Sequence, residues 1–97
     1  MSQMRIDIND RGFTTGDVVF DVSRTFDGKS FRLRYHIDRL YRSLKYARMD
    51  PDLSPEEMAD ISEEVVRRNE HLRADVGDYY VRQFVTRFFF NETATTE

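Results

Sequence analysis

The chain contains no cysteine. This absence excludes disulfide bonds, thiolate metal sites and cysteine nucleophiles, and it fits a reducing compartment. The 4 glycines are isolated, so a glycine-rich phosphate loop is absent as well. No apolar run is long enough for a signal peptide or a membrane span, and we expect a cytoplasmic protein with no membrane partner. No cluster of metal-ligand residues predicts a metal site.

Charge of one sign is not concentrated anywhere along the chain. The 15 basic and 18 acidic residues are intermixed and give a formal net charge of −3. Without a basic stripe, we expect no nucleic-acid partner. A length of 97 residues allows one small domain with a modest core, and it is too short for two domains.

The N-terminal third of the chain carries strand and turn signals. Residues 5–8 alternate between polar and apolar side chains and predict a short strand, and residues 9–12 predict a turn. Alternation over residues 17–24 predicts a longer strand. Its apolar positions are Val18, Phe20 and Val22. Asp27-Gly28 then predicts a hairpin turn, with residues 30–33 as the returning strand.

The apolar period changes to that of a helix from residue 35 onward. Residues 35–49 predict a helix that ends at Asp50-Pro51, because a residue before proline resists helical geometry. Ser54 and Glu57 form a capping-box pattern that predicts the start of a second helix. The predicted apolar stripes are Ile37, Leu40, Leu44 and Ala47 on the first helix, and Met58, Ile61, Val65 and Leu72 on the second. Residues 79–86 predict a further strand, so the fold class is α+β, with an antiparallel sheet packed on two helices.

Few of the polar residues predict chemistry by themselves. Asp17 and Asp21 lie four residues apart and share a strand face, but a carboxylate pair on a hairpin is usually solvated, and we favour that interpretation over a catalytic dyad. For His36, near a helix start, we favour a capping or surface role over a chemical one. His71 is expected to be exposed.

Two arginines stand out from those expected on solvated helix faces. Arg39 directly precedes the apolar Leu40, and Arg82 lies inside an apolar strand. A semi-buried guanidinium needs an anionic partner, and its planar fork suits a phosphate or a carboxylate. On physical grounds alone, salt bridges to Asp or Glu are favoured over contacts with a ligand.

Five segments of the chain form a specific series of motifs. The most specific is His36-Ile37-Asp38-Arg39-Leu40, with a histidine and an arginine three residues apart at the opening of a helix. The others are Asp10-Arg11-Gly12-Phe13 with Gly16-Asp17-Val18-Val19-Phe20, Phe26-Asp27-Gly28-Lys29-Ser30-Phe31-Arg32-Leu33, Leu53-Ser54-Pro55-Glu56-Glu57, and Tyr80-Val81-Arg82 with Val85-Thr86-Arg87. These segments, in the right order over residues 9–87, resemble the N-terminal domain of the class IV aminotransferases, which are pyridoxal-phosphate enzymes of fold type IV.

The resemblance implies a cofactor, a reaction and site residues. The cofactor would be pyridoxal 5'-phosphate, with Arg39 binding its phosphate. Phe20, Tyr80 and Arg82 match residues that line the substrate pocket. The partners would be an amino acid and a 2-oxo acid, between which the enzyme transfers an amino group. Family members are commonly homodimers or larger, which implies the same for the complete protein.

The subfamily signals are mixed. Arg82 and Arg24 resemble the branched-chain amino acid aminotransferases, which act on L-amino acids, and this interpretation is favoured. Asp21-Val22 replaces the usual Glu-Gly of that group and resembles the (R)-amine transaminases. A D-amino acid transaminase, aminodeoxychorismate lyase of the same fold, and a non-catalytic α+β domain remain alternatives.

The resemblance also implies that the chain lacks a catalytic residue. In the family, the lysine that forms a Schiff base with the cofactor lies in the second domain, and neither Lys29 nor Lys45 matches it. We therefore expect residues 1–87 to be a truncated N-terminal domain that is inactive by itself. Residues 88–97, three phenylalanines and a low-complexity polar end, resemble adapter read-through and are expected to be non-native.

This expectation is tested by sequencing the source gene past the codon for Arg87. We expect the frame to continue through glycine into a second domain that carries a lysine at the family's catalytic position. A genomic frame that ends in Thr-Thr-Glu would contradict both the truncation and the enzyme interpretation of this chain.

Overall fold

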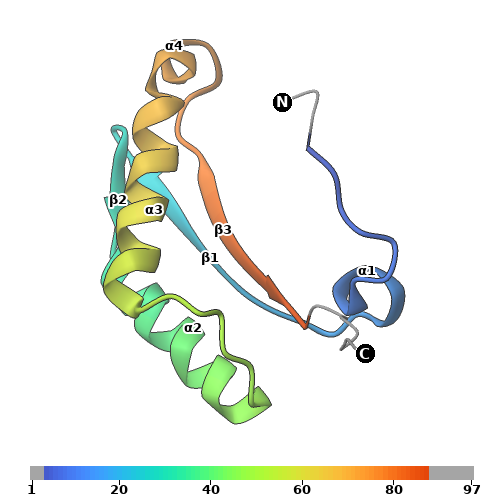
Figure 1. Ribbon diagram of the computed structural model, residues 1–97. Helices are drawn as coiled ribbons and strands as arrows, with labels where there is room; N and C mark the ends of the chain where they lie inside the picture. Colours follow the sequence, from blue (N-terminus) through green and yellow to red (C-terminus); the bar gives the residue numbers. More distant parts are fainter. Residues whose placement is uncertain (1–3, 88–97) are drawn as a thin grey trace.

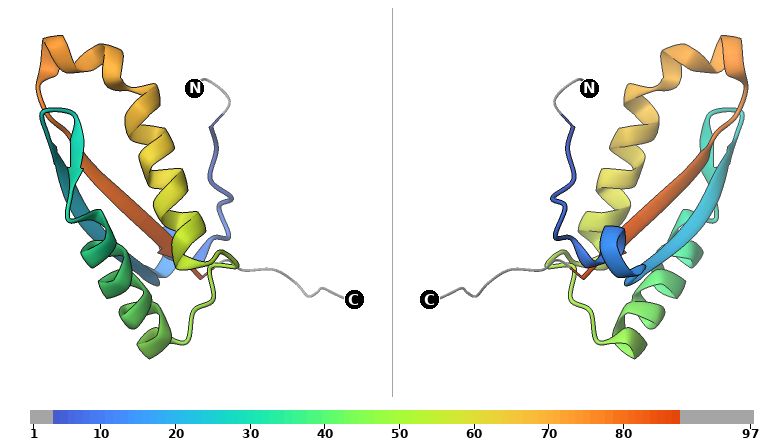
Figure 2. Two further views of the ribbon diagram at one scale, coloured as in Figure 1. Left: turned by 90° about the vertical axis from the view of Figure 1, so that its left-hand side faces the viewer. Right: turned by 90° about the vertical axis from the view of Figure 1, so that its right-hand side faces the viewer.

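The structure is a computed structural model that describes residues 4–87 (Figure 1). The elements in chain order are α1 (Arg11–Thr15), β1 (Val18–Phe26), β2 (Lys29–Phe31), α2 (Leu33–Ala47), α3 (Pro55–Arg68), the 3-10 turn η1 (Glu70–Leu72), α4 (Arg73–Val76) and β3 (Tyr80–Thr86). The strands form one antiparallel sheet in the order β2-β1-β3, and α2 and α3 cover one of its faces (Figures 1 and 2). The predicted α+β fold is therefore confirmed. The tail predicted to be non-native lies outside the described residues.

Local signals placed the hairpin turn and the start of α3 correctly. Asp27 and Gly28 have φ angles of 53° and 77°, and positive φ at both central residues is what a type I′ hairpin turn requires. The capping box at α3 is formed, with Ser54 Oγ accepting from the Glu57 N–H at 3.1 Å and Glu57 Oε1 accepting from the Ser54 N–H at 2.8 Å. The returning strand is shorter than predicted, because Leu33 already begins α2. The first helix spans Leu33–Ala47 and not the predicted residues 35–49, because Arg48, with a φ angle of 58°, ends it before the proline.

The core lies between α2 and the sheet. Ile37 is 0% exposed, and Leu40 and Leu44 are each 1% exposed, so the predicted stripe of α2 is confirmed. Burying one such aliphatic side chain contributes about 1.5–3 kcal/mol. Val19 and Val85 pack against this cluster from the sheet. Within the described residues, no helix is long and apolar enough to cross a membrane.

The predicted stripe of α3 is wrong except for Met58. The helix buries Met58, Ser62 and Val66, whereas Ile61 and Val65 are about half exposed and Leu72 lies beyond α3, also exposed. Positions spaced by four follow a row inclined to the helix axis, and α3 crosses the sheet so that this row faces it. Ser62 tolerates burial because its hydroxyl donates to the Met58 carbonyl at 2.8 Å.

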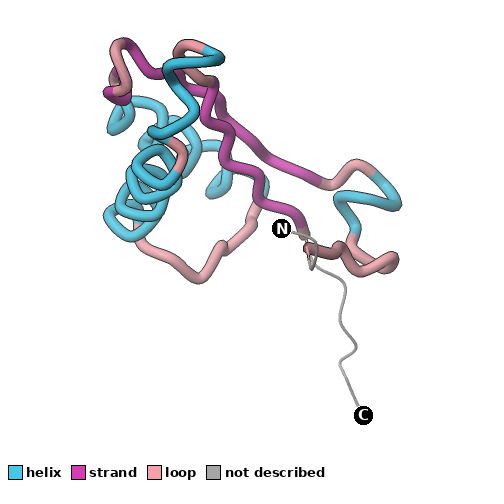
Figure 3. The backbone as a smooth tube through the Cα atoms, turned by 90° about the horizontal axis from the view of Figure 1, so that it is seen from above, coloured by secondary structure: helices cyan, strands magenta, loops and turns pink. Residues whose placement is uncertain are grey.

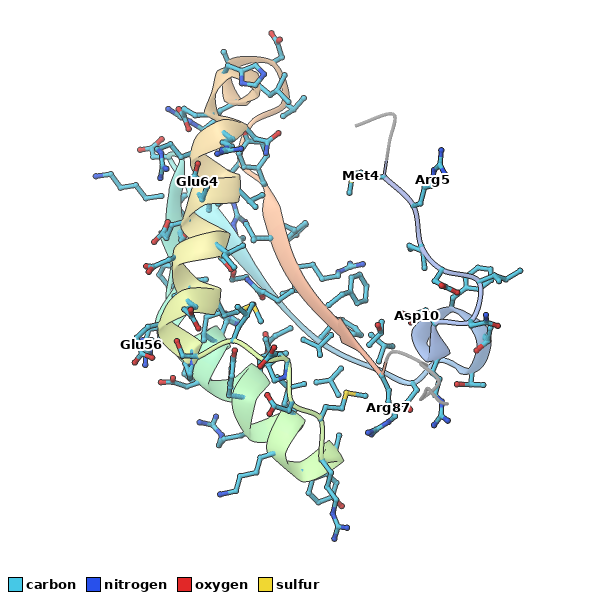
Figure 4. All side chains as sticks on the ribbon, viewed as in Figure 1. Met4, Arg5, Asp10, Glu56, Glu64 and Arg87 are labelled. Carbon is cyan, nitrogen blue, oxygen red and sulfur yellow. The ribbon has the colours of Figure 1, made fainter. Side chains whose placement is uncertain are left out.

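The predicted strand at residues 5–8 is also wrong. Residues 4–7 have no regular structure and lie away from the sheet, where Met4 and Arg5 are labelled in Figure 4. Alternating side chains form a strand only when a neighbouring strand supplies backbone partners, and none of the described strands pairs with this segment. The turn predicted over residues 9–12 lies at residues 8 and 9, and Arg11 begins α1.

Hydrogen bonds connect the start of helix α1 to the end of β3. Asp10 caps the helix by accepting from the Gly12 N–H at 2.7 Å, and its other carboxylate oxygen accepts from the Thr86 hydroxyl at 2.8 Å. A Cβ atom at Gly12 would lie 2.3 Å from Thr86 Cγ2, so only glycine fits there. Figure 4 shows Asp10 and Arg87 at this junction. The segment immediately before β1 is therefore hydrogen-bonded to the end of β3.

The face of the sheet opposite the helices, here called the open face, carries an aromatic cluster. Its aromatic members are Phe20, Phe26, Phe31, Tyr80 and Phe84, which are 47–77% exposed. The helix-covered face of β1 instead presents Asp21, Ser23 and Thr25, all at most 5% exposed. The unstructured N-terminal segment lies on the side of the open face (Figure 1). Exposed apolar area of this kind predicts self-association of the isolated chain.

The substitution Phe84→Lys should reduce this self-association, because it places a charge on the open face beside Phe20. We expect association to weaken by roughly tenfold, which matches the loss of one well-packed aromatic contact. Sedimentation velocity over a concentration series measures the effect. The matched control is Tyr46→Lys, which removes an aromatic that is 93% exposed on α2. Equal effects of both substitutions would contradict the role of the open face.

Asp78 joins the hairpin turn to the start of β3. Its carboxylate accepts from the Thr25 hydroxyl at 2.8 Å, the Asp27 N–H at 3.0 Å and the Gly28 N–H at 2.9 Å. The Thr25 hydroxyl in turn accepts from the Tyr79 N–H at 3.0 Å. The N–H of Gly28 and the hydroxyl of Thr25 hold the pKa of Asp78 below its usual value, because they stabilise the carboxylate.

The stability of the fold should therefore depend on the ionisation of Asp78. Because its folded pKa is lowered, its contribution is fully present above the unfolded-state pKa of about 3.9 and is lost as the pH falls through the lower folded value. We expect Asp78→Asn to lower the melting temperature at neutral pH and this difference to shrink as the pH falls below about 3.9. Circular dichroism melts at several pH values measure this. Asp60→Asn, an exposed carboxylate on α3, is the control. A constant difference at all pH values would contradict the mechanism.

Candidate functional site

A buried carboxylate connects the middle of β1 to α2. Asp21 points toward the helices and is 5% exposed. Its Oδ2 accepts from Arg39 Nε at 2.8 Å, and its Oδ1 accepts from Arg39 Nη2 at 2.9 Å, so the contact is bidentate. His36 Nδ1 lies 2.8 Å from the same Oδ1, and the Val22 N–H donates to it at 2.9 Å. Asp21, His36 and Arg39 are called the Asp21 cluster below.

The cluster contradicts two expectations drawn from the sequence and confirms a third. The expectation that Asp17 and Asp21 form a solvated carboxylate pair is wrong. Asp21 is buried, and Asp17 instead accepts from Arg87 Nε at 2.7 Å. His36 is neither a cap nor a surface residue: its side chain is 19% exposed and faces Asp21. The favoured salt bridge of Arg39 to an acidic side chain is confirmed. A buried carboxylate is tolerated here because its lone pairs are occupied by hydrogen-bond donors.

The contact between Asp21 and Arg39 favours the charged forms of both side chains. Burial by itself would raise the pKa of Asp21, but the hydrogen bonds from Arg39 and His36 outweigh it, so the pKa lies below its usual value. The same contact with Asp21 raises the pKa of Arg39. Asp21 and Arg39 are therefore both ionised across the physiological range.

The arginine of this cluster has an edge available for a ligand. Its side chain is 48% exposed, although two of its N–H groups are occupied by Asp21. The guanidinium carbon lies 5.8 Å from the centroid of the Tyr35 ring, which flanks it. A planar guanidinium that is held along one edge presents its remaining N–H groups along the other. This donor set fits an anion such as a phosphate.

The residues proposed for the substrate side lie on the other face of β1. The register pairs Phe20 with Phe84, Val22 with Arg82, and Arg24 with Tyr80, which places Phe20, Tyr80 and Arg82 together on the open face. The guanidinium carbon of Arg82 lies 5.5 Å from the Phe20 ring centroid and 5.3 Å from that of Phe84. Arg82 is exposed between these rings, so the expectation of semi-burial is wrong.

Strand β1 is the element that the two groups share. Phe20 and Asp21 are consecutive residues, so their side chains project from opposite faces. Strand β2 pairs only with residues 24–26 of β1, so the edge of residues 18–23 away from β3 has no strand partner within residues 4–87. Seen from above, the helices lie beside this narrow sheet (Figure 3). The candidate site thus consists of two half-sites on either side of one strand.

A hollow of about 370 Å³ extends from Tyr80 and Arg82 toward α3 and α4. Its lining combines Tyr80 and Arg82 with the apolar side chains of Val65, Leu72 and Val76. The sequence did not predict this hollow, because Val65 and Leu72 were assigned to the core. It also did not identify Asp21 and His36 as partners of Arg39. The i, i+3 spacing of His36 and Arg39, which puts both on one helix face, was the available signal.

The chain matches the family described as Amino-transferase class IV over residues 18–88. It is 41% identical over 83 residues to a putative branched-chain-amino-acid aminotransferase of Methanocaldococcus jannaschii, covering 86% of this chain and 27% of that protein. It is 38% identical over 82 residues to a D-alanine aminotransferase of Listeria monocytogenes, covering 84% and 27%. The chain thus spans about a quarter of the length of these curated relatives.

A solved structure agrees with the fold. It is a branched-chain amino acid aminotransferase from T.th., complexed with N-(5'-phosphopyridoxyl)-L-glutamate, and it superimposes with a TM-score of 0.70 at 28% identity. The superposition covers 87% of this chain and 28% of the other. From the family match, the identity to two relatives and the shared fold, it follows that the chain belongs to the class IV aminotransferase family.

Proposed function

We propose that this chain is the cofactor- and substrate-contacting N-terminal part of a pyridoxal-phosphate-dependent aminotransferase. The observation that carries the proposal is the guanidinium of Arg39, which is held along one edge by Asp21 and exposed along the other. Family membership supports it, as do the phosphopyridoxyl ligand of one solved relative and the pyridoxamine 5'-phosphate of another structure of that enzyme.

In this proposal Arg39 binds the phosphate of the cofactor. A phosphate presents several acceptor oxygens, and a guanidinium with its inner edge already fixed offers them a planar set of donors. Asp21 contacts only Nε and Nη2 of Arg39, whose side chain remains 48% exposed. When bound, pyridoxal 5'-phosphate supplies the electron sink for the reaction at the substrate carbon.

Phe20, Tyr80 and Arg82 form the substrate side. The rings of Phe20 and Phe84 flank the guanidinium of Arg82, which leaves a cation surrounded by apolar surface. Such a surface suits an amino acid that carries a carboxylate and an apolar side chain. A branched-chain L-amino acid is the favoured donor, with a 2-oxo acid as acceptor, and the 41% identity to a putative branched-chain-amino-acid aminotransferase supports it. The second candidate is a D-amino acid donor, favoured by the 38% identity to a D-alanine aminotransferase.

The group that moves the proton is proposed to lie outside this chain. Lys29 begins β2 in the hairpin, and Lys45 is exposed in the last turn of α2. Neither belongs to the Asp21 cluster, and Lys29, the register partner of Phe26, lies at the hairpin end of the open face. We therefore propose that the 97-residue chain is inactive, that the complete protein supplies the lysine, and that it is a cytoplasmic homodimer or larger assembly.

The phosphate role of Arg39 is tested with pyridoxamine 5'-phosphate, which has no aldehyde and so cannot react with lysines. Ligand-detected NMR at micromolar protein concentration measures binding below the range of self-association. We expect Arg39→Ala to weaken binding by at least about tenfold, in line with the loss of a charge-assisted contact. Arg42→Ala, one turn further along α2, is the control and should have no effect. Equal binding by the chain and by Arg39→Ala would contradict the proposal.

The identity of the amino donor is tested in the complete protein by comparing the turnover of L-leucine with that of D-alanine. Turnover of L-leucine with a 2-oxo acid supports the branched-chain interpretation. Turnover of D-alanine alone would replace it with the second candidate.

A further inference from the structure

An arginine that binds an anion must first be held in one orientation. The Arg39 side chain is long and 48% exposed, and a free side chain of this kind loses rotamer entropy when it binds a ligand. The structure gives it a fixed support: Nε and Nη2 both donate to one carboxylate, at 2.8 Å and 2.9 Å. This geometry defines the plane of the guanidinium before any ligand arrives.

The support is itself rigid. Asp21 is 5% exposed in the middle of β1, and the N–H of the next residue, Val22, donates to its Oδ1 at 2.9 Å. His36 Nδ1 approaches the same oxygen at 2.8 Å from α2, one turn before Arg39. The carboxylate is thus fixed from the strand and from the helix, and it transmits that position to the guanidinium.

We propose that Asp21, braced by His36, is the positioning residue that orients Arg39 toward the anion it binds. The inference rests on the proposed phosphate role of Arg39 and adds to it which side chains make that role effective. Asp21 does not contact the anion in this proposal. It acts through Arg39, and its contribution is geometric.

Two effects of Asp21 on anion binding have opposite signs, which makes the inference testable. Its negative charge repels an anion at Arg39, so charge alone predicts that neutralising Asp21 strengthens binding. Its bidentate contact orients the guanidinium, so positioning predicts that neutralising it weakens binding. Water at this half-exposed arginine screens the repulsion, whereas loss of one carboxylate oxygen removes the fixed plane. We therefore expect positioning to dominate.

His36 adds a spectroscopic signature. A neutral imidazole donates to Asp21 from Nδ1 only when the proton is on that nitrogen. The cluster therefore holds neutral His36 in the Nδ1–H tautomer, and the nitrogen chemical shifts of the ring report it. In Asp21→Asn the acceptor charge is lost, and the tautomer populations should move toward the Nε2–H form.

The experiment uses the 97-residue chain and pyridoxamine 5'-phosphate, detected on the ligand by NMR as above. We expect Asp21→Asn to bind roughly tenfold more weakly and Asp21→Glu, which restores a carboxylate, to bind within about threefold of the unsubstituted chain. The matched control is Asp17→Asn. It breaks another aspartate–arginine pair, just before β1, in which Asp17 accepts from Arg87 Nε at 2.7 Å, and should leave binding unchanged. Circular dichroism verifies that each variant folds.

A second variant keeps the test decisive if Asp21→Asn does not fold. Arg39→Lys retains the positive charge but cannot make the two-pronged contact with Asp21. Positioning predicts that it also binds roughly tenfold more weakly, whereas charge alone predicts unchanged binding.

The outcomes separate the inference from the proposed function. If Asp21→Asn binds as tightly as the unsubstituted chain or more tightly, while Arg39→Ala loses binding, positioning is overturned and the phosphate role stands. If Arg39→Lys binds as well as the unsubstituted chain, positioning is likewise overturned. If no binding depends on Arg39, the phosphate role fails and the inference fails with it.

Discussion

The bidentate contact between Asp21 and Arg39 is the constraint on which the arrangement of this chain depends. A carboxylate in the middle of a strand remains buried only when donors surround it, and α2 supplies two of the side chains that do so. Docking α2 in this way also directs Ile37 and Leu40 into the interface, because they lie on the same side of the helix. Polar and apolar contacts thus select the same packing of helix on sheet.

This packing determines which face of the sheet is covered. The helices cover the face of β1 that carries Asp21, Ser23 and Thr25, and they leave the aromatic face exposed. Burial of a polar face is possible because several of its groups find partners: the Thr25 hydroxyl donates to Asp78, and Gln83 Nε2 donates to Ser62 Oγ at 3.0 Å. Ser23 Oγ and Gln83 Oε1 are buried without a hydrogen-bond partner among residues 4–87. The exposed aromatic face is consequently free to contact a substrate or another part of the complete protein.

One strand therefore serves both half-sites. Its covered face holds the guanidinium proposed for the cofactor phosphate, and its open face carries the aromatic and cationic residues proposed for the substrate. Because Phe20 and Asp21 are consecutive, the backbone of β1 sets the position of one half-site relative to the other. The hydrogen bonds of Asp78 and Thr25 help to fix this relative position, since they join the hairpin end of β1 to the residues just before Tyr80. The half-sites remain separate within the described residues, which agrees with a chain that spans about a quarter of its curated relatives.

The sequence by itself determined the features whose causes are local. Asp27-Gly28 specified the hairpin turn through its tolerance of positive φ, Ser54 and Glu57 specified the start of α3, and the three- and four-residue spacing specified the buried side of α2. The tertiary structure alone decided the features that need a partner. Residues 4–7 form no strand because no described strand pairs with them, and α3 buries Ser62 in place of Ile61 because its crossing over the sheet selects a different row. The burial of Asp21 and the inward position of His36 also need partners. A buried charge is stable only when hydrogen-bond donors surround it, and the donors to Asp21, on His36 and Arg39, lie 15 and 18 residues away in the sequence.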